Sequence, residues 1–195
     1  LTPDTAGRFD LELVVGDGTS SSTADTASIW VAGDLDVPAD YATVGDALDA
    51  YVSGTISLAA GTWAPDDLLV EDRSVTIQGA GIGSTTLDGE GTHRLFTVVG
   101  AGAELVLRDL TVQDGYATWG GAIDVVEGHV TLDGVLVQDC WAVYGGALYL
   151  DLGQLTVRDS HLVDNAAGTF GGVAFLANGG PLTVDRSIVA MNTAG

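Results

Sequence analysis

Pairs of adjacent glycines recur along this chain at a nearly constant spacing. The pairs begin at Gly120, Gly145 and Gly171, so the steps are 25 and 26 residues. The surrounding segments, TWGGAIDV, VYGGALYL and TFGGVAFL, share an aromatic residue before the pair and alternating apolar residues after it. A fixed period of about 20 to 50 residues is the sequence signature of a repeat architecture. We therefore expect a stack of similar units.

Apolar residues on both sides of the glycine pairs alternate with other residues and recur with the same period. Side chains along a β-strand point alternately to opposite faces, so each alternating set lies on one face. Three short strands in about 25 residues, each with one apolar face, cannot bury that face alone and must stack on the next unit. The sequence therefore predicts an all-β fold, a parallel β-helix. The expected core columns are Leu105, Leu107, Val130, Leu132, Leu155, Val157, Leu182 and Val184; Ile123, Val125, Leu148, Leu150, Ala174 and Leu176; and Val112, Val137, Leu162 and Val189.

The glycine pairs are expected at the corners where one strand turns into the next. Glycine adopts unusual backbone angles at no steric cost and lets neighbouring backbones approach closely. Trp119, Tyr144 and Phe170 precede the three pairs and should form an aromatic column that climbs the coil at about 4.8 Å per turn. Tyr116 and Trp141 begin a second aromatic column.

The chain divides into three regions. Residues 1–35 contain the alternating stretch RFDLELVVGDG and then TSSSTADTAS, a Ser/Thr-rich run typical of a loop or linker. Residues 36–55 contain a short capping helix and the lead into the first coil, and residues 56–195 form the coils. In the first stretch, one face of the expected strand carries Phe9, Leu11 and Leu13.

The capping helix is predicted from a single amphipathic segment, YATVGDALDAYVSG. Thr43 is the expected N-cap, with Asp46 three residues later, and Gly54 is the expected stop. After this segment the sequence contains only short β-like runs interrupted by glycine and aspartate, so no second helix is expected.

Two stretches resemble known families. DYATVGDALDAYVSGTISLAAGTW, followed by SVTIQGAGIGSTTLDG, resembles the start of the right-handed parallel β-helix of the pectin-lyase-like superfamily, and the glycine segments resemble the GGAI repeats of chlamydial polymorphic outer membrane proteins. That repeat family pairs its glycines with Phe-x-x-Asn; Asn165 and Asn192 keep the asparagine here, and no matching position keeps the phenylalanine. The resemblance covers roughly residues 36–195 and implies a right-handed solenoid. It implies little about activity, because one fold serves many functions.

The charge balance narrows the choice of partners. The chain carries 27 acidic side chains against six arginines and no lysine, a formal net charge of −21. Nucleic acid is held by clustered Lys and Arg, so we do not expect it as a partner. No apolar run is long enough for a membrane span, and no signal-peptide pattern is present. The chain begins without methionine, which suggests a processed product or a segment of a longer protein, and we expect an extracellular or cell-surface location.

Charged residues on the outer face form a column of alternating sign. Its members are Arg108, Asp133, Arg158 and Asp185, at intervals of 25, 25 and 27 residues. Stacked coils would place arginine beside aspartate, and such cross-strand pairs contribute about 0.2 to 1 kcal/mol each. The column is interpreted as a structural ladder; the alternative is an acid and arginine site for uronate binding or β-elimination.

The sequence predicts no catalytic residues and no metal site. Asp66 and Asp67 form the only Asp-Asp pair and have no companions at coil spacing, whereas inverting hydrolysis needs neighbouring carboxylates on one face. His93, His129 and His161 lie at unlike positions in their repeats, so they suggest no common metal site. Cofactors are not expected. Calcium stays open, because DGEG at 88–91 and VVGDGTS at 14–20 are oxygen-rich turns, although neither matches an EF-hand loop.

The leading hypothesis for function is a non-catalytic extracellular or surface β-helix: an adhesin, passenger or fibre subunit. The last coil has no recognisable cap, so we expect either further coils of the same chain or self-association end to end. In the second case the strand with Phe9, Leu11 and Leu13 would add to the next subunit.

The alternative hypothesis is a carbohydrate-active enzyme or carbohydrate-binding module of the pectin-lyase-like superfamily. Its expected sugar-stacking patch consists of Tyr116, Trp119, Trp141 and Tyr144. Converging carboxylates in a groove would favour the enzyme, and periodic columns alone would favour the adhesin.

Overall fold

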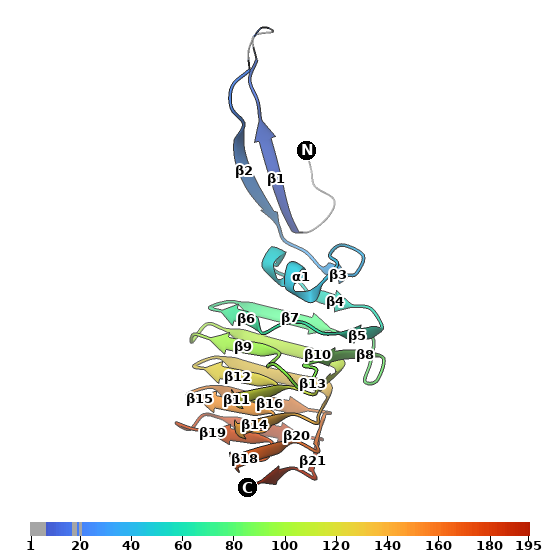
Figure 1. Cartoon of the computed structure of the whole chain (residues 1–195), viewed down its shortest axis with the longest axis vertical. Helices are drawn as coiled ribbons and strands as arrows, with labels where there is room; N and C mark the ends of the chain where they lie inside the picture. The colour runs from blue at the N-terminus through green and yellow to red at the C-terminus, as the bar shows by residue number, and fades with distance from the viewer. Residues whose placement is uncertain (1–6, 17–18, 20) are drawn as a thin grey trace.

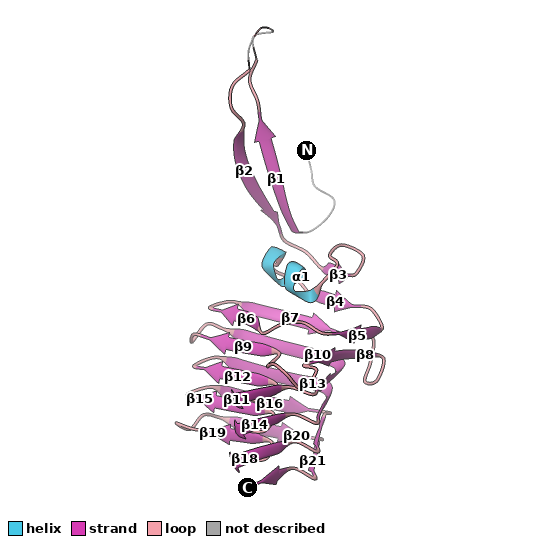
Figure 2. Cartoon of the chain, in the orientation of Figure 1, coloured by secondary structure: helices cyan, strands magenta, loops and turns pink. Residues whose placement is uncertain are grey.

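The chain folds into a parallel β-solenoid of about 6 turns with one short helix near its N-terminal end. The computed structural model describes residues 7–16, 19 and 21–195. Figures 1 and 2 show the coils stacked along one axis, with strands joined by short loops. The solenoid that the sequence repeat predicts is confirmed.

Three parallel sheets form the sides of the solenoid. The largest follows the path β3 (Leu35–Val37), β4 (Ile56–Leu58), β7 (Ser74–Gln78), β10 (Glu104–Gln113), β13 (His129–Gln138), β16 (Gln154–Arg158) and β20 (Leu182–Asp185), with β5 (Gly61–Trp63), β8 (Thr85–Asp88), β17 (His161–Val163) and β21 (Ile188–Ala190) attached beside it. The second sheet contains β6 (Leu68–Glu71), β9 (Phe96–Val99), β12 (Ile123–Val126), β15 (Leu148–Asp151) and β19 (Ala174–Leu176). The third contains β11 (Tyr116–Trp119), β14 (Trp141–Tyr144), β18 (Ala166–Phe170) and β22 (Thr193–Ala194).

The predicted core columns lie in register inside the solenoid. Leu107 is the partner of Leu132, which is followed by Val157 and Val184 in the next two coils. The first three of these side chains are buried, whereas Val184 is 48% exposed. The difference has a simple cause: β20 is the edge strand of its sheet, so no further described strand covers it.

The glycine pairs lie at corners, as expected, and they combine an unusual backbone angle with a close approach between neighbouring coils. The first glycine of each pair has a positive φ, for example 52° at Gly120 and 65° at Gly145. The second glycine faces the next coil: a Cβ built on Gly146 would lie 2.1 Å from the carbonyl oxygen of Gly172. The first position therefore requires glycine for its backbone angle, and the second because two backbones nearly touch there.

The capping helix α1 spans Val44–Ala50 and covers the N-terminal end of the solenoid (Figure 1). The hydroxyl of Thr43 accepts a hydrogen bond from the backbone N–H of Asp46 at 3.1 Å and donates to its carboxylate at 2.7 Å. The buried face of the helix, with Val44, Ala47 and Leu48, joins the core of the coils. The helix ends earlier than expected, because Tyr51 is already extended.

The N-terminal region is a β-hairpin that projects beyond α1 (Figure 1). Strand β1 (Gly7–Leu13) pairs antiparallel with β2 (Asp25–Val31). The expectation of a strand tied to the body by a Ser/Thr linker is therefore wrong in part, since residues 25–28 of that run belong to β2 and pair with β1. Threonine and other residues of a polar run form strands readily when a partner strand lies alongside.

Candidate functional site

Two rows of aromatic rings climb the face of the third sheet. Tyr116 on β11 stacks on Trp141 on β14, with ring centroids 4.9 Å apart and an interplanar angle of 14°. Trp119 stacks on Tyr144 at 4.6 Å and 13°, and Phe170 continues this row at 6.3 Å. The structure thus brings together all four residues of the expected sugar-stacking patch.

A third aromatic row, which the sequence reading missed, lies beside the second. Tyr149 on β15 is the register partner of Phe175 on β19, and their ring centroids are 5.8 Å apart. Tyr149 also lies 5.0 Å from Trp119 at an angle of 59°, which joins the two rows into one aromatic surface. The sequence did contain a signal for this row. Tyr149 occupies the outward position between the core residues Leu148 and Leu150, and Phe175 occupies the same position in the next coil.

Stacking decides which rings a ligand can reach. Neighbouring stacked rings cover one another's faces, so a row offers free faces chiefly at its ends. Tyr116 and Trp119 begin the two rows on the side nearer to the helix, and they are 47% and 42% exposed. Trp141 and Tyr144 are more covered. The rings that a ligand can reach are therefore Tyr116 and Trp119 at one end of the rows and Phe170, which is 56% exposed, at the other.

A polar cluster adjoins Trp119 and is centred on Arg94. The Arg94 guanidinium donates to the Asp67 carboxylate at 2.7 Å, to the Asp124 carboxylate at 3.3 Å and to the backbone carbonyl of Trp119 at 3.2 Å. Its Nε donates to the hydroxyl of Thr97 at 3.1 Å, and that hydroxyl donates to Asp67 at 2.8 Å. We call Asp67, Arg94, Thr97 and Asp124 the Arg94 cluster.

The Arg94 cluster brings Asp67 close to a second carboxylate that is not at coil spacing. Leu68 pairs with Phe96, and Phe96 pairs with Ile123, so the register positions of Asp67 in the next two coils are Leu95 and Ala122. These positions carry no carboxylate, and Asp67 is joined to Asp124 only through Arg94.

Asp124 is the least satisfied member of the cluster. Its side chain is 17% exposed, and its Oδ1 is buried without a hydrogen bond from the part of the chain that the structure describes. Burial raises the pKa of Asp124; Arg94 opposes this change, and the charges of Asp67 and Asp151 add to it. One oxygen of this carboxylate is therefore enclosed by the protein without a hydrogen-bond donor.

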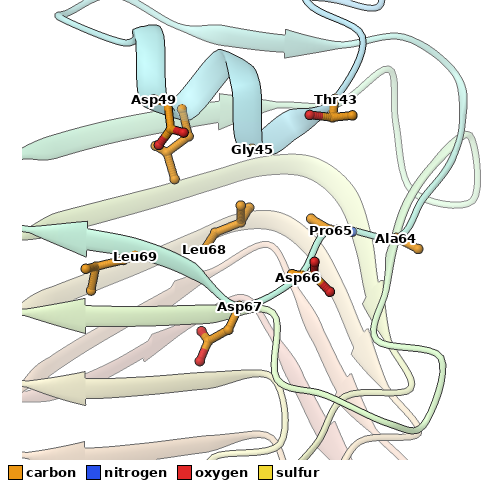
Figure 3. Close-up of a pocket in the computed structure, with 10 residues that line it drawn as sticks. Thr43, Gly45, Asp49, Ala64, Pro65, Asp66, Asp67, Leu68 and Leu69 are labelled. Carbon is orange, nitrogen blue, oxygen red and sulfur yellow. The ribbon is translucent and has the colours of Figure 1, made fainter.

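An open pocket of about 400 Å³ lies on the other side of Asp67, between α1 and residues 64–69 (Figure 3). Its walls include the carboxylates of Asp49, Asp66 and Asp67. Asp67 therefore belongs both to the pocket and to the Arg94 cluster. Arg94 in turn bonds the backbone carbonyl of Trp119, so the cluster lies between the pocket and the strand that carries Trp119.

The charged ladder lies on the largest sheet, away from the aromatic rows. Arg108, Asp133, Arg158 and Asp185 are successive register partners. Arg108 and Asp133 approach within 4.0 Å and are both about half exposed. In the adjacent column, Arg186 binds the Asp159 carboxylate at 2.6 Å and lowers its pKa. Exposed pairs of this kind support strand pairing weakly.

Asn165, which is buried, and Asn192, which is partly buried, form a ladder at another corner. The Asn165 side chain accepts from the backbone N–H of Cys140 at 3.1 Å and donates to the carbonyl of Val137 at 3.1 Å. Asn192 in the next coil accepts from the backbone N–H of Asn165 at 3.0 Å. These amides satisfy backbone groups where the coil turns, which is a structural role.

The histidines and the oxygen-rich turn do not converge. His93 bonds the Pro65 carbonyl, His129 bonds Thr156, and His161 is exposed on β17. In the DGEG turn, the Asp88 carboxylate accepts from the backbone N–H of Glu90 and from the amide of Gln113. Among the described residues, no group of three or more His, Cys, Asp or Glu side chains could hold a metal ion. The turn at 14–20 lies partly outside the described residues.

No family model matches the sequence, and comparisons with curated proteins and with solved structures give no match either. The fold class therefore rests on the structure itself. Within the described ranges, no helix is long and apolar enough to cross a membrane.

Proposed function

We propose that this chain is a non-catalytic β-helix that binds polysaccharide through the face formed by its aromatic rows, as an adhesin or passenger segment outside the cell. The supporting observation is that Tyr116 and Trp119 are nearly half exposed, although each stacks on a ring of the next coil. An exposed aromatic face packs against the C–H groups of a sugar ring, and nearby polar groups bond its hydroxyls. The resemblance to the pectin-lyase-like superfamily and to GGAI-repeat surface proteins agrees with this proposal.

The state of the carboxylates favours binding over catalysis. Asp67 and Asp124 both bond the same guanidinium, that of Arg94. Inverting hydrolysis needs one carboxyl group that gives a proton and another that activates water on opposite sides of the bond. Because one guanidinium holds both carboxylates, they are not placed on opposite sides of a bond to be cleaved, which suits a fixed binding surface better than proton transfer.

The test is affinity electrophoresis of the full chain in gels that contain a neutral, an acidic or an amine-bearing polysaccharide. Trp119→Ala should raise the dissociation constant for the retained polysaccharide about tenfold, because one stacked ring contributes on the order of 1 to 2 kcal/mol. Ile82→Ala is the matched control, since Ile82 is exposed to a similar degree, 44%, and lies outside the face.

Three results would contradict the proposal. They are a lack of retardation by all three polysaccharides, equal binding by Trp119→Ala and the unchanged protein, and release of reducing or unsaturated sugar ends. The last result would make the chain an enzyme.

We also propose that two copies associate through their last coils. This coil exposes apolar side chains, namely Leu182, Val184, Ile188, Val189 and Met191, and continues the columns that hold the inner coils together. The edge strand of this coil can pair with a further coil or with the same coil of a second copy, and α1 lies at the opposite end of the solenoid. Light scattering should give the mass of a dimer that Val184→Asp converts to a monomer; a monomer at high concentration of the unchanged chain refutes this.

A further inference from the structure

We infer that Asn178 is a site of spontaneous deamidation, and that it is the one asparagine of the chain that the fold leaves reactive. The chain contains three asparagines, Asn165, Asn178 and Asn192. Deamidation requires a side-chain amide that can move and a following backbone N–H that is free to attack it. The structure provides both at Asn178 alone among the three. This inference does not depend on the proposed polysaccharide binding.

The reaction joins two groups that are neighbours along the chain. The backbone nitrogen of Gly179 attacks the side-chain carbonyl carbon of Asn178, and the new C–N bond closes a succinimide ring. The attacking nitrogen loses its proton, and the amide nitrogen takes up a proton and leaves as ammonia. Water then opens the ring at one of its two carbonyl groups, which gives either aspartate or isoaspartate. Glycine in the second position lets the nitrogen approach most easily, because it has no β-carbon.

Asn178 and Gly179 lie in the exposed turn between β19 and β20. The backbone N–H of Gly179 donates no hydrogen bond to any described residue, and no atom lies within 4 Å of a Cβ built on this glycine. The side-chain amide of Asn178 donates one hydrogen bond, to the carboxylate of Asp151 in the preceding coil. Because this pair is exposed, water can replace the hydrogen bond at little cost. The ring can therefore close without unfolding of the coil.

The other two asparagines are held at both reacting groups. The amide nitrogen of Asn165 donates three hydrogen bonds of 2.9 to 3.1 Å, and the following N–H, that of Ala166, donates to the carbonyl of Cys140 at 2.9 Å. The amide nitrogen of Asn192 donates two, at 2.9 and 3.0 Å, and the N–H of Thr193 donates to the carbonyl of Asn165 at 2.9 Å. Either residue can react only after its coil opens locally.

Both products disturb the turn that holds the last coil. On one side of the turn, the N–H of Ala177 donates to the carbonyl of Leu150 at 2.8 Å, and on the other the carbonyl of Pro181 accepts from the N–H of Leu155 at 3.0 Å. Isoaspartate adds a methylene group to the backbone between these two hydrogen bonds. Aspartate places a second carboxylate against Asp151, and like charges on neighbouring strands weaken their pairing. Deamidation therefore loosens the last coil.

The experiment follows the full chain in mildly alkaline buffer, folded and in urea, by tryptic digestion and mass spectrometry. Cleavage after Arg158 and Arg186 gives one peptide that holds both Asn165 and Asn178, so fragment spectra identify which amide has become an acid. A sample digested before incubation corrects for reaction during digestion. We expect Asn178 to react in the folded chain within about threefold of its rate in urea, and folding to slow Asn165 and Asn192 at least about tenfold.

Ala166→Gly is the matched control, because it creates a second Asn-Gly pair whose amide and following N–H are both bonded in the fold. The two pairs should react alike in urea, whereas in the folded variant only Asn178 should react. An intact Asn178 in the folded chain overturns the inference. Equal reaction of both pairs in the folded variant also overturns it, because the sequence and not the fold would then decide. A thermal melt confirms that the variant is folded.

Limited trypsin digestion tests the loosening of the last coil. Asn178→Asp should speed cleavage after Arg186 about two- to fivefold, because repulsion from Asp151 lets this coil open more often. The exchanged pair, Asp151→Asn with Asn178→Asp, again places one amide beside one carboxylate and should restore the original rate. Equal cleavage rates for all three chains would refute the loosening.

Discussion

Replacing Gly146 with alanine tests whether the glycine pairs recur because neighbouring coils touch there. The φ of Gly146 is not positive, so the added methyl group would meet a steric cost alone. An ideal Cβ would lie 2.1 Å from the carbonyl oxygen of Gly172 and 2.7 Å from that of Ala166, and both neighbours are backbone atoms that cannot turn aside.

The cost follows from the separation that alanine would force. Ordinary contact begins at 3.4 Å, so the two coils must separate by about 1 Å at this corner. Three backbone hydrogen bonds between the two coils, each 2.9 Å long, would then lengthen beyond hydrogen-bond range. The N–H groups of Gly145, Gly146 and Ala147 donate them to the carbonyl oxygens of Phe170, Gly171 and Val173, respectively. At about 1 kcal/mol for each bond, the free energy of unfolding should fall by about 3 kcal/mol.

The assay is urea denaturation followed by tryptophan fluorescence. Gly83→Ala is the control, because Gly83 has a φ of 73° and no atom lies within 4 Å of an added Cβ. That variant meets only the backbone cost of a left-handed residue, about 1 to 2 kcal/mol. If Gly146→Ala lost no more stability than Gly83→Ala, the close approach of coils would not be the reason for the second glycine.

Leu155→Ala should lower the free energy of unfolding by about 2 to 5 kcal/mol, because the Leu155 side chain is buried. Leu182→Ala should lower it far less, because Leu182 lies in the same column but is 49% exposed. Equal losses in paired urea melts would refute this prediction. Burial raises the pKa of Cys140 to about 12, so iodoacetamide should label this thiol in denaturant and spare it in the folded chain, as mass spectrometry can show. The pKa of Asp124 is raised on folding, chiefly by burial. Below the unfolded pKa of about 4, Asp124 is protonated in both the folded and the unfolded chain. As the pH rises from there to the folded pKa, the unfolded chain loses this proton first, so the free energy of unfolding falls. Asp124→Asn should remove that decline in calorimetric melts. An unchanged pH profile would show that Asp124 is not the group responsible.

The regular coils could be predicted because two signals coincide in them. Leu132 and Val157 lie between polar neighbours, and together with Leu107 they recur every 25 residues, so period and strand pattern indicate the same column. The glycine pairs predicted the positions of the corners, and the aromatic residues before them predicted the aromatic rows. Each of these features depends only on spacing along the chain.

The Arg94 cluster could not be predicted in this way. Asp67, Arg94 and Asp124 occupy different register positions, and Arg94 stands in the loop before β9 at the position that Gly121 holds in the next coil. The contact between these three residues depends on the length and path of the loops that connect the strands. A periodic pattern in the sequence does not contain this information. The pairing of β2 with β1 depends likewise on a partner strand, because a Ser/Thr-rich run is a strand only when another strand lies beside it.

The exposed last coil has a consequence for amide hydrogen exchange. Each coil of a solenoid is stabilised mainly by its two neighbours, so a coil with one neighbour opens first and the others follow in order. Deuterium should therefore enter β20, β21 and β22 long before it enters β10 and β13, whose inward side chains are fully buried. Arg94 and Trp119 belong to the part of the chain that opens late. Fraying at the C-terminal edge would leave the proposed sugar-binding face assembled.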